Sequence, residues 1–153
     1  MPNLYKWLGI STVVIVLDLF TKHLIQKTFQ LGEFLPITSF FDLVRFHNEG
    51  AAFSFLANAG GWQKWFFTSV SVLAILVISY LLKKHQNQKL FCFGLALILG
   101  GAIGNLYDRI TLGYVVDFLY FHFGDNYFPA FNVADSAISV GVGILLIDSF
   151  KVK

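Results

Sequence analysis

Two aspartates lie in apolar surroundings, where a charged side chain is energetically costly. Asp117 lies between a valine pair and a phenylalanine, and Asp135 lies two residues into an apolar segment that begins at Val133. Two carboxylates that share one site of low dielectric cannot both ionise cheaply, so one of them keeps its proton. The pair then offers a base that activates water and an acid that protonates a carbonyl oxygen or a leaving amine, as in aspartic proteases. The sequence leaves open which of the two is the base.

Asp135 also has a purely structural explanation. Asn132 is a good N-cap residue, and an acidic side chain in the first turn of a helix interacts favourably with the helix dipole. The catalytic interpretation is favoured because Asp117 and Asp135 fall at the same predicted face of a membrane.

Asp18 and Lys22 are a second pair of ionisable residues inside an apolar segment. Their spacing of four residues allows an ion pair within one helix. The alternative is that they brace a group on another helix. Both interpretations stay open, and either one makes the residues candidates for a functional site.

Asn105 and Arg109 are also four residues apart, at the end of a glycine-containing apolar segment. They can act as an interfacial cap, although an arginine at this depth usually has a carboxylate partner. Gly100 and Gly104 have the small-xxx-small spacing that predicts close helix packing. A phosphate-binding loop is disfavoured because no strand precedes the glycines and neither a GxGxxG pattern nor a Walker lysine is present.

The elements that must position these residues are membrane helices. Of the 153 residues, 56% are hydrophobic and only 13% are charged, whereas a soluble domain has roughly 25% charged residues. Four apolar segments are about as long as a helix needs to cross the hydrocarbon core. They cover residues 7–25, 65–82, 90–106 and 133–150. We therefore predict an all-α membrane protein in which residues 1–153 form a single domain.

The basic residues predict how the helices are oriented. Six of the eleven lie on one side of the predicted membrane, at Lys6, in the loop 83–89 and after the last helix. Both termini should therefore face the cytoplasm, and the longer loops 27–64 and 107–132 should face outward. Residues 40–46 alternate loosely and predict a short strand. The aromatic stretch 118–131 is typical of a membrane–water interface.

Several other classes of protein and site are disfavoured. The net charge of +2 is too small for the dense basic patch of a nucleic-acid-binding protein. Cys92 is the only cysteine, and the four histidines are scattered along the chain. Neither a disulfide within the chain nor a zinc site is therefore predicted.

Five ordered blocks of the sequence resemble the lipoprotein signal peptidase family, the type II signal peptidases of bacteria. The matching blocks, in chain order, are Asp18 with Lys22, Asn48–Phe53, Gly101–Arg109, Val115–Phe118 and Phe131–Ile138. Together they cover nearly the whole chain.

The resemblance implies an intramembrane aspartyl endopeptidase of the bacterial inner membrane, with its active site near the periplasmic face. It implies four transmembrane helices, a small extracytoplasmic β-element in the first outer loop and a short surface helix in the second. The substrate would be a prolipoprotein that is cut just before a cysteine carrying diacylglycerol. Membrane lipid and globomycin-type peptide antibiotics are the other expected partners, and a monomer without metal or cofactor is expected to suffice.

The resemblance also assigns roles to residues. It implies that Asp117 and Asp135 are the catalytic pair. The residues to which it assigns supporting or substrate-binding roles are Asp18, Lys22, Asn48, Gly50, Gly101, Asn105, Arg109 and Asn132.

Two other functions compete with the peptidase hypothesis. A small proton-coupled transporter would also use carboxylates within the membrane, but transporters tend to contain internal repeats, and none is visible here. A structural membrane subunit would use its carboxylates only to pair helices, for example Asp108 or Asp135 with Arg109.

Overall fold

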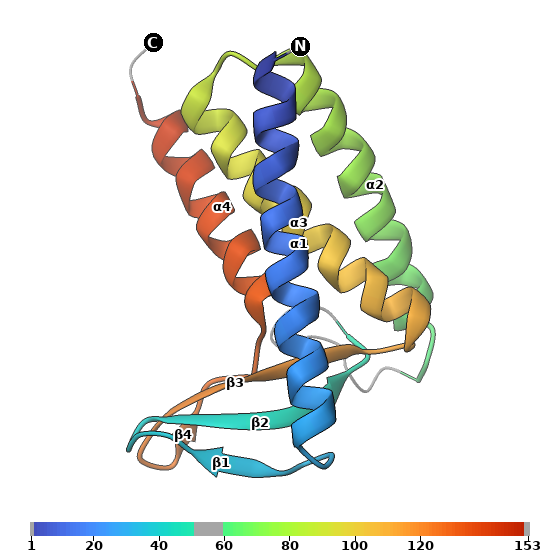
Figure 1. Ribbon diagram of the computed structural model, residues 1–153, viewed down its shortest axis with the longest axis vertical. Helices are drawn as coiled ribbons and strands as arrows, with labels where there is room; N and C mark the ends of the chain where they lie inside the picture. Colours follow the sequence, from blue (N-terminus) through green and yellow to red (C-terminus); the bar gives the residue numbers. More distant parts are fainter. Residues whose placement is uncertain (1, 51–59, 152–153) are drawn as a thin grey trace.

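Residues 2–50 and 60–151 are described in the computed structural model. Within them the elements are α1 (Pro2–Thr28), β1 (Phe34–Pro36), β2 (Phe41–Asn48), α2 (Gln63–Lys84), α3 (Lys89–Thr111), β3 (Val115–Phe123), β4 (Asn126–Tyr127) and α4 (Val133–Ser149). The helices lie side by side, and the sheet lies across one end of the bundle, opposite the two chain termini (Figure 1).

Three of the helices are long and apolar enough to cross a membrane, namely residues Asn3–Thr28 of α1, all of α2 and all of α3. The fourth helix, α4, has 17 residues, which is at the lower end of the length of about 17–25 residues that can span. Three of the predicted spans therefore coincide with helices of spanning length, and the fourth crossing stays a prediction.

The end of α3 differs from the sequence-based prediction. The apolar segment was expected to end at residue 106, but the helix continues to Thr111. One face of these last turns is buried, with Asn105, Asp108 and Arg109 enclosed by the other elements, while Tyr107 and Ile110 on the opposite face are exposed. The apolar pattern thus ends where a polar helix face begins, and the helix itself goes on.

Glycines allow α3 to approach its neighbours closely. A Cβ atom on Gly100 would lie 2.6 Å from the Val14 Cβ of α1. A Cβ atom on Gly101 would meet the backbone carbonyl of Ala134 in α4, and one on Gly104 would meet the carboxylate of Asp18. The predicted close helix packing at Gly100 and Gly104 is confirmed, and α3 lies between α1 and α4.

The sheet is antiparallel and has the strand order β1-β2-β3-β4. The strand predicted at residues 40–46 is confirmed as β2. In its pairing with β3, Phe46 lies opposite Asp117 and Asn48 lies opposite Val115, after a register shift between Leu43 and Phe46. Asn48 is therefore a diagonal neighbour of Asp117 on the same face of the sheet.

The prediction of a short surface helix in the second outer loop is wrong. After α3, residues 112–132 contain β3 and β4 and no helix. The aromatic and β-branched residues of this stretch favour a strand because they pack well on a pleated surface. Gly113, with φ of +87°, provides the turn that leads the chain from α3 into β3.

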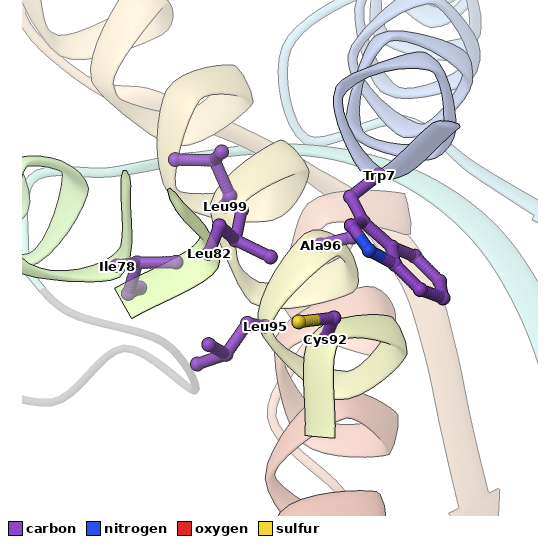
Figure 2. Packing of buried hydrophobic residues seen from close by; sticks show 7 residues of the cluster. All are labelled: Trp7, Ile78, Leu82, Cys92, Leu95, Ala96 and Leu99. Carbon is purple, nitrogen blue, oxygen red and sulfur yellow. The ribbon is translucent and has the colours of Figure 1, made fainter. Parts of the chain in front are cut away.

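The end of the bundle near the termini has an apolar core. Its buried residues come from α1, α2 and the first half of α3, and Figure 2 shows their side chains close together. We call this set the terminal core: Trp7, Ile78, Leu82, Cys92, Leu95, Ala96 and Leu99.

Candidate active site

Asp117 lies on β3, and both of its carboxylate oxygens accept a hydrogen bond from a side-chain amide. Asn48 of β2 donates to Oδ2 over 3.0 Å, and Asn132 donates to Oδ1 over 2.9 Å. Only 1% of the Asp117 surface is exposed. The side chain is therefore held in one orientation from two sides.

Asp135 lies in the first turn of α4 and is 3% exposed. Asn105 of α3 donates to its Oδ1 over 2.8 Å, and its backbone N–H donates to Asn132 Oδ1 over 2.8 Å. The predicted N-cap at Asn132 is thus confirmed. Since the amide nitrogen of the same Asn132 side chain donates to Asp117, one residue connects the two aspartates.

Lys22 is the centre of a buried charge cluster beside the aspartates. Its ammonium lies 2.7 Å from Asp18 Oδ2 and 3.1 Å from Asp108 Oδ2, and it donates to Asn105 Oδ1 over 3.0 Å. Asp18 also accepts a hydrogen bond of 2.8 Å from the backbone of Ala134 in α4. Both interpretations of this pair are therefore correct, since it forms an ion pair within α1 and also braces α3 and α4.

Asp108 is a member of this cluster that we did not nominate as a site residue from the sequence. Besides Lys22, it accepts a hydrogen bond of 3.1 Å from the backbone of Val116, immediately before Asp117. The sequence feature that could have identified Asp108 is its spacing of three residues from Asn105, which places both side chains on one face of the helix. Asp108 fixes the start of β3 relative to α3.

Arg109 does not have the carboxylate partner that its depth suggested. Within residues 2–50 and 60–151, no carboxylate oxygen lies within 4.0 Å of its guanidinium. Its Nη2 donates to the backbone carbonyl of Gly50 over 2.9 Å, and its Cζ lies 5.8 Å from the centre of the Phe67 ring. Arg109 thus connects the end of β2 to α2 and α3.

The block that began at Asn48 extends to Phe53, but its residues 51–53 lie outside the described part of the chain.

A cavity of about 220 Å³ opens beside Asp135 between α2, α3 and α4. Its lining includes Asn105, Arg109 and Ile138. In the part of the chain that the structure describes, no donor is hydrogen-bonded to Asp135 Oδ2, whereas Oδ1 is occupied by Asn105. Asp135 can therefore present one oxygen to a molecule in the cavity.

Asp117 lies outside the helices, and the pKa of its carboxyl is raised. Burial, and next the negative charge of Asp135, raise the pKa of Asp117 to about 8 from an ordinary value of 3.8. The hydrogen bonds from Asn48 and Asn132 act in the opposite direction but are the weaker influence. At neutral pH the Asp117 carboxyl therefore keeps its proton, as expected for two acids in one site.

The structure brings the nominated residues together from five elements, α1, β2, α3, β3 and α4. Hydrogen bonds and ion pairs join Asp18, Lys22, Asn48, Asn105, Asp108, Asp117, Asn132 and Asp135, which we call the polar network. Arg109 and Gly50 bind each other at its edge, and Gly101 sets the contact between α3 and α4.

The chain is similar to known proteins over nearly its whole length. A family model described as signal peptidase (SPase) II matches residues 10–151. The lipoprotein signal peptidase of Ralstonia nicotianae is 59% identical over 145 residues, which are 95% of this chain and 84% of the relative. The lipoprotein signal peptidase of Paraburkholderia phytofirmans is 54% identical over 149 residues, 97% of this chain and 87% of the relative.

Solved structures have the same fold. A bacterial membrane enzyme determined by the in meso method at 2.3 Å resolution is 28% identical, with a TM-score of 0.84 over 95% of this chain and 88% of that one. A second, determined at 1.9 Å, is 27% identical with a TM-score of 0.83 over 97% and 94% of the two chains.

Proposed function

This chain belongs to the signal peptidase II family, and on that premise we propose that it cleaves prolipoproteins as an intramembrane aspartyl endopeptidase. The cut would fall just before the cysteine that carries diacylglycerol. The observation that carries the proposal is the pair Asp117 and Asp135, which are both buried and both hydrogen-bonded to the side chain of Asn132. Asp135 also accepts a hydrogen bond from Asn105.

Asp135 acts as the base in this proposal. Its Oδ2 takes a proton from a water molecule, whose oxygen attacks the carbonyl carbon of the scissile peptide bond. Asp117, protonated because its pKa is raised to about 8, donates its proton to the carbonyl oxygen. The tetrahedral diol then collapses. The proton on Asp135 goes to the leaving amine, and a diol hydroxyl returns a proton to Asp117, so the pair regains its starting state.

The remaining nominated residues position this pair. Asn48, Asn105 and Asn132 orient the carboxylates through their amide groups. Lys22 holds Asn105 in turn, and it forms ion pairs with Asp18 and Asp108. No metal or cofactor takes part in the proposed steps.

The orientation of the protein is part of the proposal. The termini lie at one end of the bundle and the sheet at the other (Figure 1), and the end with the termini carries the lysines at residues 83, 84 and 89. We place that end in the cytoplasm and the active site near the periplasmic face of the bacterial inner membrane. A monomer that spans the membrane four times, with residues 1–153 as one domain, suffices. Globomycin-type peptides would inhibit it by occupying the site.

Cleavage of a diacylglyceryl-modified prolipoprotein by the purified protein in detergent tests the proposal. Asp117→Asn and Asp135→Asn should each lower kcat by at least about a thousandfold, because each removes one partner of an acid–base pair. Asp148→Asn is the matched control, since it makes the same change at the other end of α4 and should leave turnover unchanged.

Two results would contradict the proposal. One is a folded wild-type protein that leaves this substrate intact under conditions in which a Ralstonia or Paraburkholderia relative cleaves it. The other is turnover near the wild-type level in either variant. Proton-coupled solute uptake by vesicles, without any cleavage, would instead favour the transporter, a function that the comparisons do not support.

A further inference from the structure

A large aromatic cavity lies at the end of the sheet where β3 turns into β4. Its volume is about 750 Å³, within the range of roughly 300–1,000 Å³ typical of ligand pockets. The side chains that line it include Phe40 from the β1–β2 connection, Phe121 and Phe123 from β3, and Phe128 and Phe131 from the segment that leads to α4. We call this space the aromatic cavity.

The aromatic cavity is adjacent to the candidate active site. A smaller cavity of about 250 Å³ runs along α4 and is lined by Asp135, Ser136, Ser139 and Val140. The two cavities share Phe128 and Phe131 as lining residues. A continuous surface therefore leads from the proposed base, Asp135, along one face of α4 to the aromatic cavity.

Asp135 thus lines two cavities on different sides. One lies between α2, α3 and α4 and contains Arg109, and the other leads over Phe128 and Phe131 to the aromatic cavity. The proposed substrate has two apolar parts that meet near the scissile bond, the signal segment and the diacylglyceryl group. Two cavities that both reach Asp135 can hold one part each.

The lining of the aromatic cavity indicates what kind of lipid fits it. Of the residues that the structure describes, no Lys, Arg, Asp or Glu lines it, and its polar members are Ser39, His122 and Asn126. A phosphate headgroup is usually bound by arginine or lysine side chains. Acyl chains on a glyceryl group are uncharged and apolar, so a lining of phenylalanines without charged side chains matches their chemistry.

We propose that the aromatic cavity binds the acyl chains of the diacylglyceryl-cysteine in the substrate, and that the chains reach it from Asp135 over Phe128 and Phe131. The inference rests on the proposed function, since it assumes this substrate. The modified cysteine directly follows the scissile bond, so its lipid must leave the site close to the catalytic pair. The cavity along α4 leads from that point to the aromatic cavity, and the signal segment then takes the groove between α2, α3 and α4.

Phe128→Ser tests the proposal because Phe128 lines both cavities. The matched control is Phe34→Ser on β1, since Phe34 does not line the aromatic cavity and both phenylalanines are 49% exposed. KM and kcat are measured with prolipoprotein that carries either long or short acyl chains. Phe128→Ser should raise KM for the long-chain substrate about tenfold, with little change in kcat or in KM for the short-chain substrate. Phe34→Ser should change none of these constants.

Equal KM values for wild type, Phe128→Ser and Phe34→Ser on the long-chain substrate would overturn the inference, while cleavage itself would leave the proposed function intact. A second experiment needs neither turnover nor a variant. A diacylglyceryl-cysteine peptide with photoreactive acyl chains is cross-linked to the wild-type protein in detergent. Labelling should fall on the peptides that contain Phe121, Phe128 and Phe131. Labelling confined to α2, or equal labelling by a phospholipid with the same photoreactive chains, would overturn the inference.

Discussion

The two halves of α3 show two different ways of holding helices together. Its first half carries Cys92, Leu95, Ala96 and Leu99 of the terminal core, where the contacts are apolar (Figure 2). Its second half carries Asn105 and Asp108 of the polar network, and Arg109 at the edge of that network. Both halves have a buried face, and they differ in what a substitution there would leave behind.

In the terminal core, a smaller side chain leaves a cavity whose cost depends on how far its surroundings collapse. In the polar network, removal of one group leaves a partner charged, buried and unpaired. The first region should therefore control stability, and the second should control both stability and chemistry. The following predictions test that difference, beginning with the largest expected effect.

Lys22→Met should destabilise the protein most, by about 3–5 kcal/mol, because it leaves the carboxylates of Asp18 and Asp108 without their shared cation. Lys27→Met, at an exposed site on the same helix, is the control and should have little effect. Thermal unfolding in detergent measures both variants. Adding Asp18→Asn to Lys22→Met should restore part of the loss, since one unpaired charge is then removed. Equal unfolding temperatures for the two lysine variants would contradict the role of Lys22.

Leu99→Ala should lower stability by about 3 kcal/mol, since Leu99 is buried in the terminal core. At a temperature where the variant is folded, its kcat should equal that of wild type, because Leu99 belongs to the terminal core and takes no part in the proposed mechanism. Urea or thermal unfolding gives the first quantity, and the peptidase assay gives the second. A large fall in kcat of the folded variant would show that the two regions are not independent.

Gly101→Ala should cost about 2 kcal/mol and reduce activity, because the new methyl group would meet the backbone carbonyl of Ala134 and push α4 from α3. Gly143→Ala provides the comparison, since nothing lies within 4 Å of a Cβ at that position of α4. It should be neutral or slightly stabilising, as alanine is the better helix former. Circular dichroism during heating distinguishes the two, and similar melting curves would contradict the close approach.

The pH should affect the polar network and leave the terminal core unchanged. Asp117 has a pKa of about 8 in the folded protein against an ordinary value of 3.8. The folded state therefore binds the proton more tightly, and the stability that this binding contributes is lost as the pH rises through about 8. Activity should fall over the same range as the proposed acid loses its proton.

Infrared spectroscopy of the carboxyl band can follow the Asp117 proton directly. Asp135→Asn removes a negative charge that helps to raise the pKa of Asp117, so the pKa should move down in that variant. A band that titrates at the same pH in both proteins would show that burial alone causes the shift.

The sequence predicted the parts of this structure that depend on composition and local spacing. The apolar segments predicted α1 to α4, and the loose alternation at residues 40–46 predicted β2. Asn132 was predicted as the N-cap of α4. These features depend on residues that are close to one another in the sequence, so a single sequence is enough to predict them.

Features that depend on distant contacts were harder to predict. The partner of Arg109 lies just after β2, and the partners of Asp108 lie in α1 and β3; no local spacing specifies them. The family resemblance predicted a short helix in the second outer loop, yet β3 forms there because β2 offers it an edge to pair with. The aromatic residues at 118–131 were noted as interfacial, but only the folded sheet shows that they enclose a cavity.

The ion pair between Asp18 and Lys22 has a consequence for the synthesis of the protein. Since α1 precedes α3 and α4 in the chain, it enters the membrane before the ribosome has supplied Asn105, Asp108 or Ala134, to which Asp18 and Lys22 are bonded in the folded protein. A lone charge in the middle of a newly inserted helix is unfavourable. Because the two charges are four residues apart on one helix and 2.7 Å from each other, each already has a counterion in the nascent chain. The same contact that later supports the proposed catalytic pair thus lets α1 partition into lipid before the other helices are made.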